Sequence, residues 1–227
     1  MSMLRNALMP TKPTLTEENL PDQQGKVFIV TGGSGGVGKE LVSILYQHNA
    51  KVYVLARSES KSNEAMAEIR KRHPSSKGEL IFLSLQLHDL TTIKATAQAF
   101  LERESRLDVV WNNAGVMIPP QGSKTAQGWE LQLGVNVLAH WLLVHFLRDT
   151  LAATARTAPK DSVRVVWVSS DAVSRAPKPA IDFDNMDYHK DEGPWDKYGR
   201  SKAGNILHAT EMAKRAGPEG VINLVRS

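Results

Sequence analysis

Residues 25–38 read GKVFIVTGGSGGVG, and this stretch decides the fold. Within it, 27–30 is an apolar, β-rich run that stops at a cluster of glycines, and apolar side chains at helical spacing follow over 39–48. A second apolar run, 51–56, comes directly after that helix. Two strands joined through a helix must be parallel, so this part of the chain predicts a βαβ unit with a glycine-rich turn after its first strand.

The alternation of strands and helices continues along the chain. Further helices are expected near 59–72, 91–104, 126–154 and 196–215, and further strands over 80–85, 108–111, 163–168 and 221–225. Six strands, most of them continuous apolar runs, indicate an α/β fold: a doubly wound parallel sheet of the Rossmann type, with helices on both faces. We expect one domain over 25–227, preceded by a polar, proline-containing arm over 1–24.

A long loop over 171–194 breaks this rhythm between the fifth strand and the last helix. Loops of this length in compact domains are usually functional or disordered. This one lies beyond the carboxyl end of a parallel strand, which is where such sheets bind ligands.

The composition excludes several classes of function. The 227 residues include 28 Lys and Arg against 24 Asp and Glu, a net charge of +4 without a concentrated basic tract, so nucleic acid is not an expected partner. There is no Cys, and the His residues lack ligand spacing, so we predict no metal site. No stretch reaches the roughly 20 apolar residues of a membrane span, and no signal-peptide core precedes the first strand, so we expect a soluble, cytoplasmic protein.

The glycine cluster fits three spacings known from dinucleotide-binding turns: GxGxxG over 33–38, TGxxGxxG over 31–38 and TGxxxGxG over 31–38. All three end at Gly38 and meet the same physical need. A tight turn without Cβ atoms lets backbone N–H groups and a helix N-terminus approach a pyrophosphate. Because this turn follows a strand and opens a helix, it predicts a dinucleotide site.

The end of the second strand indicates which dinucleotide binds. A protein that prefers NAD places an Asp or Glu there to accept a hydrogen bond from the ribose, whereas this sequence has Arg57 and Ser58. A carboxylate would repel a 2′-phosphate, but a guanidinium pairs with it and a hydroxyl adds a donor. We therefore predict NADP(H) as the cofactor.

Four motifs follow one another at the predicted strand ends: TGxxxGxG over 31–38, Asn-Asn-Ala-Gly over 112–115, the Ser pair 169–170, and Tyr198-x-x-x-Lys202 on the next helix. Together they resemble the short-chain dehydrogenase/reductase superfamily, and the chain is similar to its retinol-dehydrogenase-like branch and fungal relatives. The resemblance covers about 25–226. It also favours the TGxxxGxG spacing, because TGxxGxxG marks longer relatives of the epimerase type.

Tyr198 and Lys202 are four residues apart on a predicted helix, so their side chains share one face. A tyrosine phenol titrates near about 10, and a neighbouring ammonium favours the phenolate. Tyr198 is the candidate general acid/base. The resemblance implies that Lys202 also binds the nicotinamide ribose, that Ser170 binds the substrate oxygen, and that Asn136 holds a water in a proton relay. A slip of one residue in the strand would give the role of Ser170 to Ser169.

The same resemblance implies the cofactor contacts. They are expected from Gly32, Ser34, Gly36, Val37, Gly38, Arg57, Ser58, Gln86, Leu87, Asn113, Ala114, Gly115, Tyr198 and Lys202. Gln86 stands where relatives often have an Asp that contacts adenine, and an amide can still donate and accept there.

These residues predict an NADP(H)-dependent oxidoreductase that interconverts a ketone or aldehyde and an alcohol, with a specialised metabolite as a plausible substrate from the fungal resemblance. The family continues into a Pro-Gly turn, a substrate lid and a seventh strand, whereas this sequence ends at Ser227. The alternative is therefore an NADP-binding protein or shortened form with little or no activity, and an isomerase or dehydratase is a third reading. The sequence leaves open the substrate, the direction of reaction and whether the chain forms a homo-oligomer.

Overall fold

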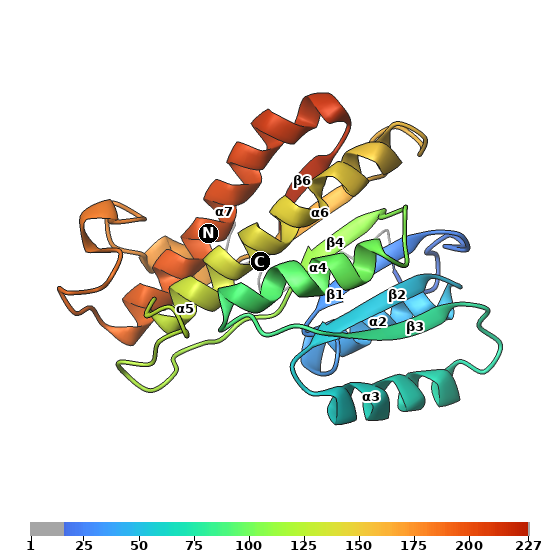
Figure 1. The fold of residues 1–227 in the computed structure, drawn as a ribbon, viewed down its shortest axis with the longest axis horizontal. Helices are drawn as coiled ribbons and strands as arrows, with labels where there is room; N and C mark the ends of the chain where they lie inside the picture. The colour runs from blue at the N-terminus through green and yellow to red at the C-terminus, as the bar shows by residue number, and fades with distance from the viewer. Residues whose placement is uncertain (1–15, 227) are drawn as a thin grey trace, which may run out of the picture.

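Six parallel strands form the sheet at the centre of the computed structural model, which describes residues 16–226 (Figure 1). The strands are β1 (Val27–Thr31), β2 (Lys51–Ala56), β3 (Glu79–Ser84), β4 (Val109–Asn112), β5 (Arg164–Val168) and β6 (Ile222–Arg226). Their order in the sheet is β3-β2-β1-β4-β5-β6, and every neighbouring pair is parallel. The prediction of a doubly wound parallel sheet is confirmed.

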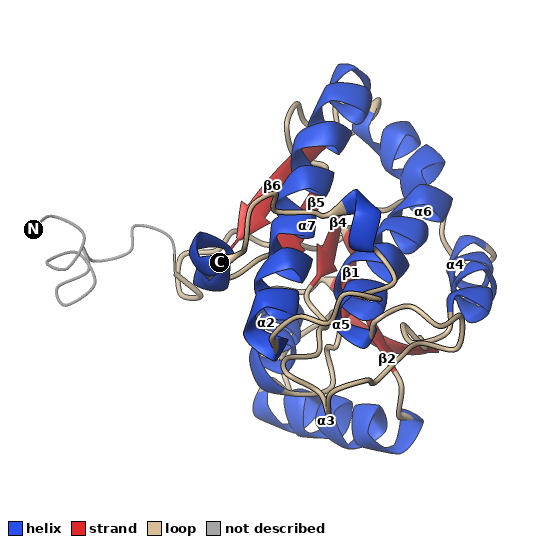
Figure 2. Cartoon of the chain, turned by 90° about the vertical axis from the view of Figure 1, so that its left-hand side faces the viewer, coloured by secondary structure: helices blue, strands red, loops and turns tan. Residues whose placement is uncertain are grey.

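Helices cover both faces of this sheet (Figure 2). The α-helices are α2 (Gly36–Gln47), α3 (Glu59–Arg72), α4 (Ile93–Leu101), α5 (Leu131–Leu133), α6 (Ala139–Ala155) and α7 (Pro194–Ala216). Short turns of other helix types are η1 (Leu90–Thr92), η2 (Gly134–Leu138), η3 (Asp171–Arg175), η4 (Phe183–Asn185) and η5 (Gly217–Glu219). The apolar side chains of α2 and α3 pack on one face, and those of α4, α6 and α7 pack on the other.

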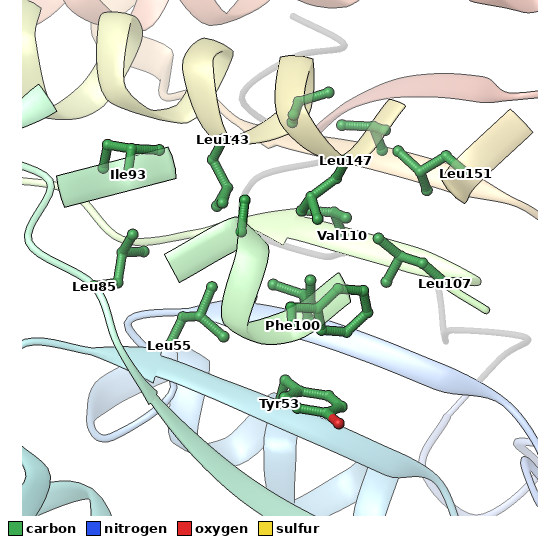
Figure 3. Close-up of a cluster of buried hydrophobic side chains, with 14 of the residues drawn as sticks. Tyr53, Leu55, Leu85, Ile93, Phe100, Leu107, Val110, Leu143, Leu147 and Leu151 are labelled. Atoms are coloured by element: carbon green, nitrogen blue, oxygen red, sulfur yellow. The ribbon is translucent and has the colours of Figure 1, made fainter. Parts of the chain in front are cut away.

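The continuous apolar runs of the strands explain this double cover. Successive side chains of a strand point to opposite faces, so Val27 and Ile29 enter the core under α4 and α6, while Phe28 and Val30 enter the core under α2. Figure 3 shows the larger core, where Phe100 of α4 and Leu147 of α6 meet the sheet. Both cores hold the strand ends rigidly, and the candidate site is built on those ends.

The helix predicted near 126–154 begins later than expected. Gly128 has a φ of +83°, which only glycine adopts readily, and a bridge joins Lys124 to Glu130. The helical backbone begins at Leu131, where the Glu130 carboxylate accepts a hydrogen bond of 2.8 Å from the Leu133 N–H. Apolar spacing alone does not reveal this turn, because it reports which side chains are buried and not the backbone conformation of a glycine.

The described part of the predicted N-terminal arm contacts the loop after α2. The Gln23 N–H donates to the His48 carbonyl at 2.7 Å, and the Asn49 side chain donates to Asp22 at 2.9 Å. Residues 1–15 of the arm lie outside the described residues. Within residues 16–226, no helix combines the length and the apolar character that crossing a membrane would need.

Candidate functional site

A cavity of about 930 Å³ opens at the carboxyl ends of the first four strands. It lies where the chain turns from β1 to β2 on one side and β4 pairs with β1 on the other, which is the switch point where open α/β sheets bind ligands. Every cofactor contact predicted from the sequence, other than Tyr198 and Lys202, lines this cavity: Gly32, Ser34, Gly36, Val37, Gly38, Arg57, Ser58, Gln86, Leu87, Asn113, Ala114 and Gly115.

The glycine turn has the backbone geometry that a pyrophosphate site requires. Gly32 and Gly36 have φ values of +69° and +52°, which a side chain would strain. A Cβ at Gly38 would lie 2.5 Å from the Gly32 carbonyl oxygen, so α2 can start this close to β1 only with glycine. The first turn of α2 carries no acidic residue, which leaves the positive end of the helix dipole available to an anion.

Thr31 joins the glycine turn to the loop after β4. Its hydroxyl accepts hydrogen bonds of 2.9 Å from the N–H groups of Asn113 and Ala114, and the Asn113 side chain donates back to the Thr31 carbonyl at 2.9 Å. The same hydroxyl lies 3.0 Å from Nε2 of His140 on α6. Burial lowers the pKa of His140 to about 4. The Asn113 side chain thus holds the two walls of the cavity together, and its backbone faces the cavity.

The far end of the cavity is cationic. Arg57 is exposed at the end of β2, and Lys61 lies one helical turn further along, on α3. Ser58 caps α3 by accepting a hydrogen bond of 3.3 Å from the Lys61 N–H. The described residues that line the cavity include these two cations and Lys124 but no Asp or Glu. The charge therefore favours a ligand with phosphate groups.

Tyr198 and Lys202 lie together on α7, beside the cavity. The Lys202 ammonium lies 5.7 Å from the centre of the Tyr198 ring and donates to the Val168 carbonyl at 3.0 Å. A Cβ at Gly115, in the cavity wall, would be 3.6 Å from Lys202 Nζ. Burial lowers the pKa of Lys202. None of the four predicted catalytic side chains lines the cavity itself, but Lys202 adjoins it through Gly115.

The Asn136 side chain is fully engaged within the protein. It accepts a hydrogen bond of 2.9 Å from the Val116 N–H, and it donates to the Val116 carbonyl at 2.9 Å and to the Ser201 hydroxyl at 3.0 Å. Asn136 lies in η2, a π-helical turn, which releases backbone carbonyls from the regular α-helical pattern. Its side chain fixes the loop after β4 against α7, and a role in a water relay stays a prediction.

The two candidate serines have different surroundings. Ser169 is buried, and its hydroxyl donates to the Lys202 carbonyl at 2.9 Å, which ties β5 to α7. Ser170 is half-buried, and its hydroxyl accepts from the Ala172 N–H at 3.2 Å. A hydroxyl that accepts one hydrogen bond still has its own proton to donate. The geometry therefore leaves Ser170 free to act on a ligand and gives Ser169 a structural contact.

The cavity has further lining residues that were not among the predicted cofactor contacts: Gly35, Leu55, Ala56, Lys61, Leu85, His88, Val116, Lys124, Leu131 and Val135. Leu55, Ala56 and Leu85 could have been found, because they end or follow predicted strands. Lys61 could have been found because it lies in the first turn of the helix that follows Arg57 and Ser58. Lys124 and Leu131 carry no such signal, since their placement depends on the turn at Gly128.

A family model of short chain dehydrogenases matches residues 26–180. The chain belongs to this family. Among curated members, this short-chain dehydrogenase is 56% identical over 208 residues to the short-chain dehydrogenase/reductase pkfC of Emericella nidulans, covering 92% of this chain and 67% of that protein. It is 50% identical over 226 residues to a short-chain dehydrogenase/reductase of Phomopsis amygdali, and the match covers 97% of this chain and 68% of that protein. The predicted superfamily and the similarity to fungal members are confirmed.

Solved structures share the fold of this chain. An uncharacterised protein of Mycobacterium paratuberculosis is 26% identical to the short-chain dehydrogenase, with a TM-score of 0.74 over 92% of this chain and 69% of that one. The NADP complex of Pseudomonas aeruginosa RhlG has a TM-score of 0.69 at 24% identity, and the match covers 89% of this chain and 72% of that one. The chain thus spans about two thirds of the length of its two fungal relatives.

Proposed function

We propose that this chain carries an NADP(H)-dependent oxidoreductase that interconverts a ketone or aldehyde and an alcohol. One observation carries the proposal: Gly115 lines the cavity, a Cβ at this glycine would lie 3.6 Å from Lys202 Nζ, and Lys202 lies beside Tyr198. A dinucleotide that extends from the cations at Arg57 and Lys61 past the glycine turn would therefore end next to an acid/base pair.

The residues fit the cofactor chemically. The close approach of Gly38 to the Gly32 carbonyl and the positive φ of Gly36 leave room for a pyrophosphate at the start of α2. Arg57 and Ser58 suit a 2′-phosphate, and Gln86 can bond an adenine. The wall lacks any carboxylate that would repel the phosphate.

When bound, the cofactor supplies or accepts the hydride at its nicotinamide. In the direction of reduction, Tyr198 donates a proton to the oxygen of the carbonyl substrate as that oxygen gains charge. The adjacent Lys202 ammonium stabilises the phenolate that forms and is held in place by the Val168 carbonyl. Ser170 donates a hydrogen bond to the same substrate oxygen. Asn136 acts as a positioning residue, because it fixes Val116 and hence the wall next to Lys202.

The test is to follow NADPH consumption with a panel of carbonyl compounds that includes fungal specialised metabolites, the substrate class suggested by the sequence resemblance. We expect Tyr198→Phe to keep the affinity for NADPH and to lower turnover by at least about a hundredfold, because only the proton donor is lost. Tyr46→Phe is the matched control, since Tyr46 is buried in α2 on the opposite face of the sheet. Near-parental turnover in Tyr198→Phe would remove the acid/base assignment.

Binding of NADPH without turnover on any carbonyl would instead support the alternative, an NADP-binding protein with little or no activity. A cytoplasmic location and a homo-oligomer remain predictions, which fractionation and size-exclusion chromatography with light scattering would test.

A further inference from the structure

The 179–192 segment is the central part of the loop between η3 and α7, and it lies beside the first turns of α7 (Figure 1, orange). The start of the loop approaches this helix closely at Gly199, where a Cβ would lie 3.3 Å from the Cα of Ala176. Gly199 is the residue after Tyr198, so the loop begins close to the turn of α7 that carries Tyr198.

Arg200 holds both ends of the 179–192 segment. Its Nε and Nη2 donate to the two carboxylate oxygens of Glu192 at 2.7 and 2.9 Å, and its Nη1 donates to the Pro179 carbonyl. One planar guanidinium on α7 thus binds both Pro179 and Glu192, which are 13 positions apart in the sequence. The single Arg200 side chain therefore attaches both ends of the 179–192 segment to α7.

Both partners of the Arg200–Glu192 pair are shielded from solvent, whereas the Lys197–Asp191 and His189–Asp187 pairs of this segment each have an exposed partner. The side chains of Arg200 and Glu192 are 7% and 17% exposed, whereas Asp191, which pairs with Lys197 at 2.6 Å, is 68% exposed. Exposed pairs contribute little, but a buried, bidentate pair is strongly destabilised when one partner is removed. Arg200 is therefore the principal charged attachment of the segment among the described residues.

The attached segment contacts the loop after β4, and it is followed at once by the turn of α7 that contacts Tyr198. Gln121, in the loop after β4, donates to both carboxylate oxygens of Asp191 at 2.9 and 2.7 Å. On α7, Trp195 is 58% exposed, and its ring lies edge-on to Tyr198 with 6.2 Å between the centroids. The end of the segment is thus tied to the loop after β4, three residues before the contact that Trp195 makes with Tyr198.

We propose that Arg200 is a positioning residue, which fixes the 179–192 segment as a preformed wall of the substrate site beside Tyr198. This inference rests on the proposed function for its substrate and on the contacts of Arg200 for its mechanism. Arg200 lies between Tyr198 and Lys202 in sequence, but its side chain points to the loop and not to the cofactor cavity, which it does not line. Its loss should therefore affect substrate binding and not cofactor binding.

Hydrogen exchange read by mass spectrometry tests the attachment without any need for activity. In Arg200→Gln we expect amides of the 179–192 segment to exchange at least about tenfold faster, while amides of α2 stay unchanged, because only a local opening is made easier. Arg200→Lys keeps the charge but cannot bind Glu192 and Pro179 together, so it should show the same local effect to a smaller degree. Glu192→Gln tests the same pair from the loop side.

Arg215→Gln is the matched control, because Arg215 lies on the same helix and bonds Glu211 at 2.7 Å, but is 75% exposed and far along the chain from Tyr198. It should leave the segment unchanged. Unchanged exchange in all three test variants would overturn the proposal. Faster exchange throughout the sheet would also overturn it, since that result would mean a general loss of stability.

Steady-state kinetics test the effect on substrate. Arg200→Lys should raise the KM for the carbonyl substrate about tenfold, with a smaller change in kcat and an unchanged Kd for NADPH. A KM equal to that of the parent would overturn the role in substrate binding. If the parent reduces no carbonyl compound, the proposed function fails, and the substrate role of Arg200 fails with it. The exchange experiment still decides whether Arg200 fixes the segment.

Discussion

At the scale of single residues, we expect Arg57 to decide which dinucleotide the cavity prefers. Its exposed guanidinium stands at the end of β2, next to the hydroxyl of Ser58. We expect the parent to bind NADPH more tightly than NADH, and Arg57→Asp to reverse the order by replacing attraction with repulsion. The loss of NADPH affinity should be about ten- to a hundredfold, the value of one charge-assisted contact.

Titration calorimetry with both cofactors measures this preference. Arg103→Asp makes the same change of charge at an exposed position that does not line the cavity, so it should leave both affinities unchanged. Equal affinities of the parent for NADPH and NADH would contradict the assignment of Arg57.

The residue-level predictions agree with the structure in where residues at strand ends lie, while their roles stay predictions. Gly32, Arg57, Gln86 and Asn113 were expected at such ends, and all of them line the cavity. The sequence could not choose between neighbouring serines, because one residue of register moves a side chain to the other face of the sheet. It also could not foresee that Val116 and Ser201 occupy the Asn136 amide, since those contacts join segments far apart in the sequence.

At the scale of the element, the start of α2 contains one glycine that close packing requires, Gly38, and one that it does not, Gly35. Gly38→Ala should lower the free energy of unfolding by about 2 to 4 kcal/mol, because its Cβ would enter the space of the Gly32 carbonyl and the Asn113 side chain. Gly35→Ser should raise it by up to about 1 kcal/mol. A Cβ at Gly35 meets nothing within 4 Å, and Gly35 caps α2 in an extended conformation that suits a serine cap.

Urea unfolding of the two variants and the parent measures these free energies. The pair is its own control, since both glycines lie in one turn and differ only in the space around the missing Cβ. Equal losses in both variants would mean that the turn tolerates no side chain anywhere, contrary to this description.

Elements whose apolar side chains repeat with a clear period were predicted well. Element boundaries that depend on a turn or a helix cap were not. The strand at 51–56 and the helix at 59–72 coincide with β2 and α3, because their apolar pattern and flanking residues agree. The start of the helix predicted from 126 depended on the turn at Gly128 and on the Glu130 cap. The long loop over 171–194 contains two short 3₁₀ turns, η3 and η4, that carry no periodic signal.

At the scale of the whole molecule, two histidines of the described residues couple stability to pH: His140, which is buried, and His208, which is half-buried. Burial lowers the pKa values of His140 and His208 from the usual 6.5 of a histidine to about 4. Between these values the unfolded chain binds more protons than the folded one, so stability falls as the pH drops from 6.5 to about 4. Each histidine should account for a loss on the order of 3 kcal/mol. Below that window both states are protonated, and the loss is complete.

His208→Leu isolates one of these contributions. Nε2 of His208 has no hydrogen-bond partner in the described structure, so an apolar side chain should be tolerated at neutral pH. Urea unfolding across the window should show a smaller loss of stability in this variant than in the parent. His145→Leu, at an exposed position of α6, should retain the full loss. The same pH dependence in His208→Leu and the parent would remove His208 as a source.

The strand order also divides the chain into two consecutive halves. β1 to β3 come from residues 27–84 and β4 to β6 from residues 109–226, and the halves meet where Phe28, Ile29 and Val30 pair with β4. The dinucleotide cavity straddles that joint, with the glycine turn and Arg57 on one side and residues 113–115 on the other. A ligand that binds only the joined halves favours their association by mass action. A chain cut in the loop at 102–106 should therefore reassemble from its two fragments, and NADPH should increase the affinity of the fragments for each other.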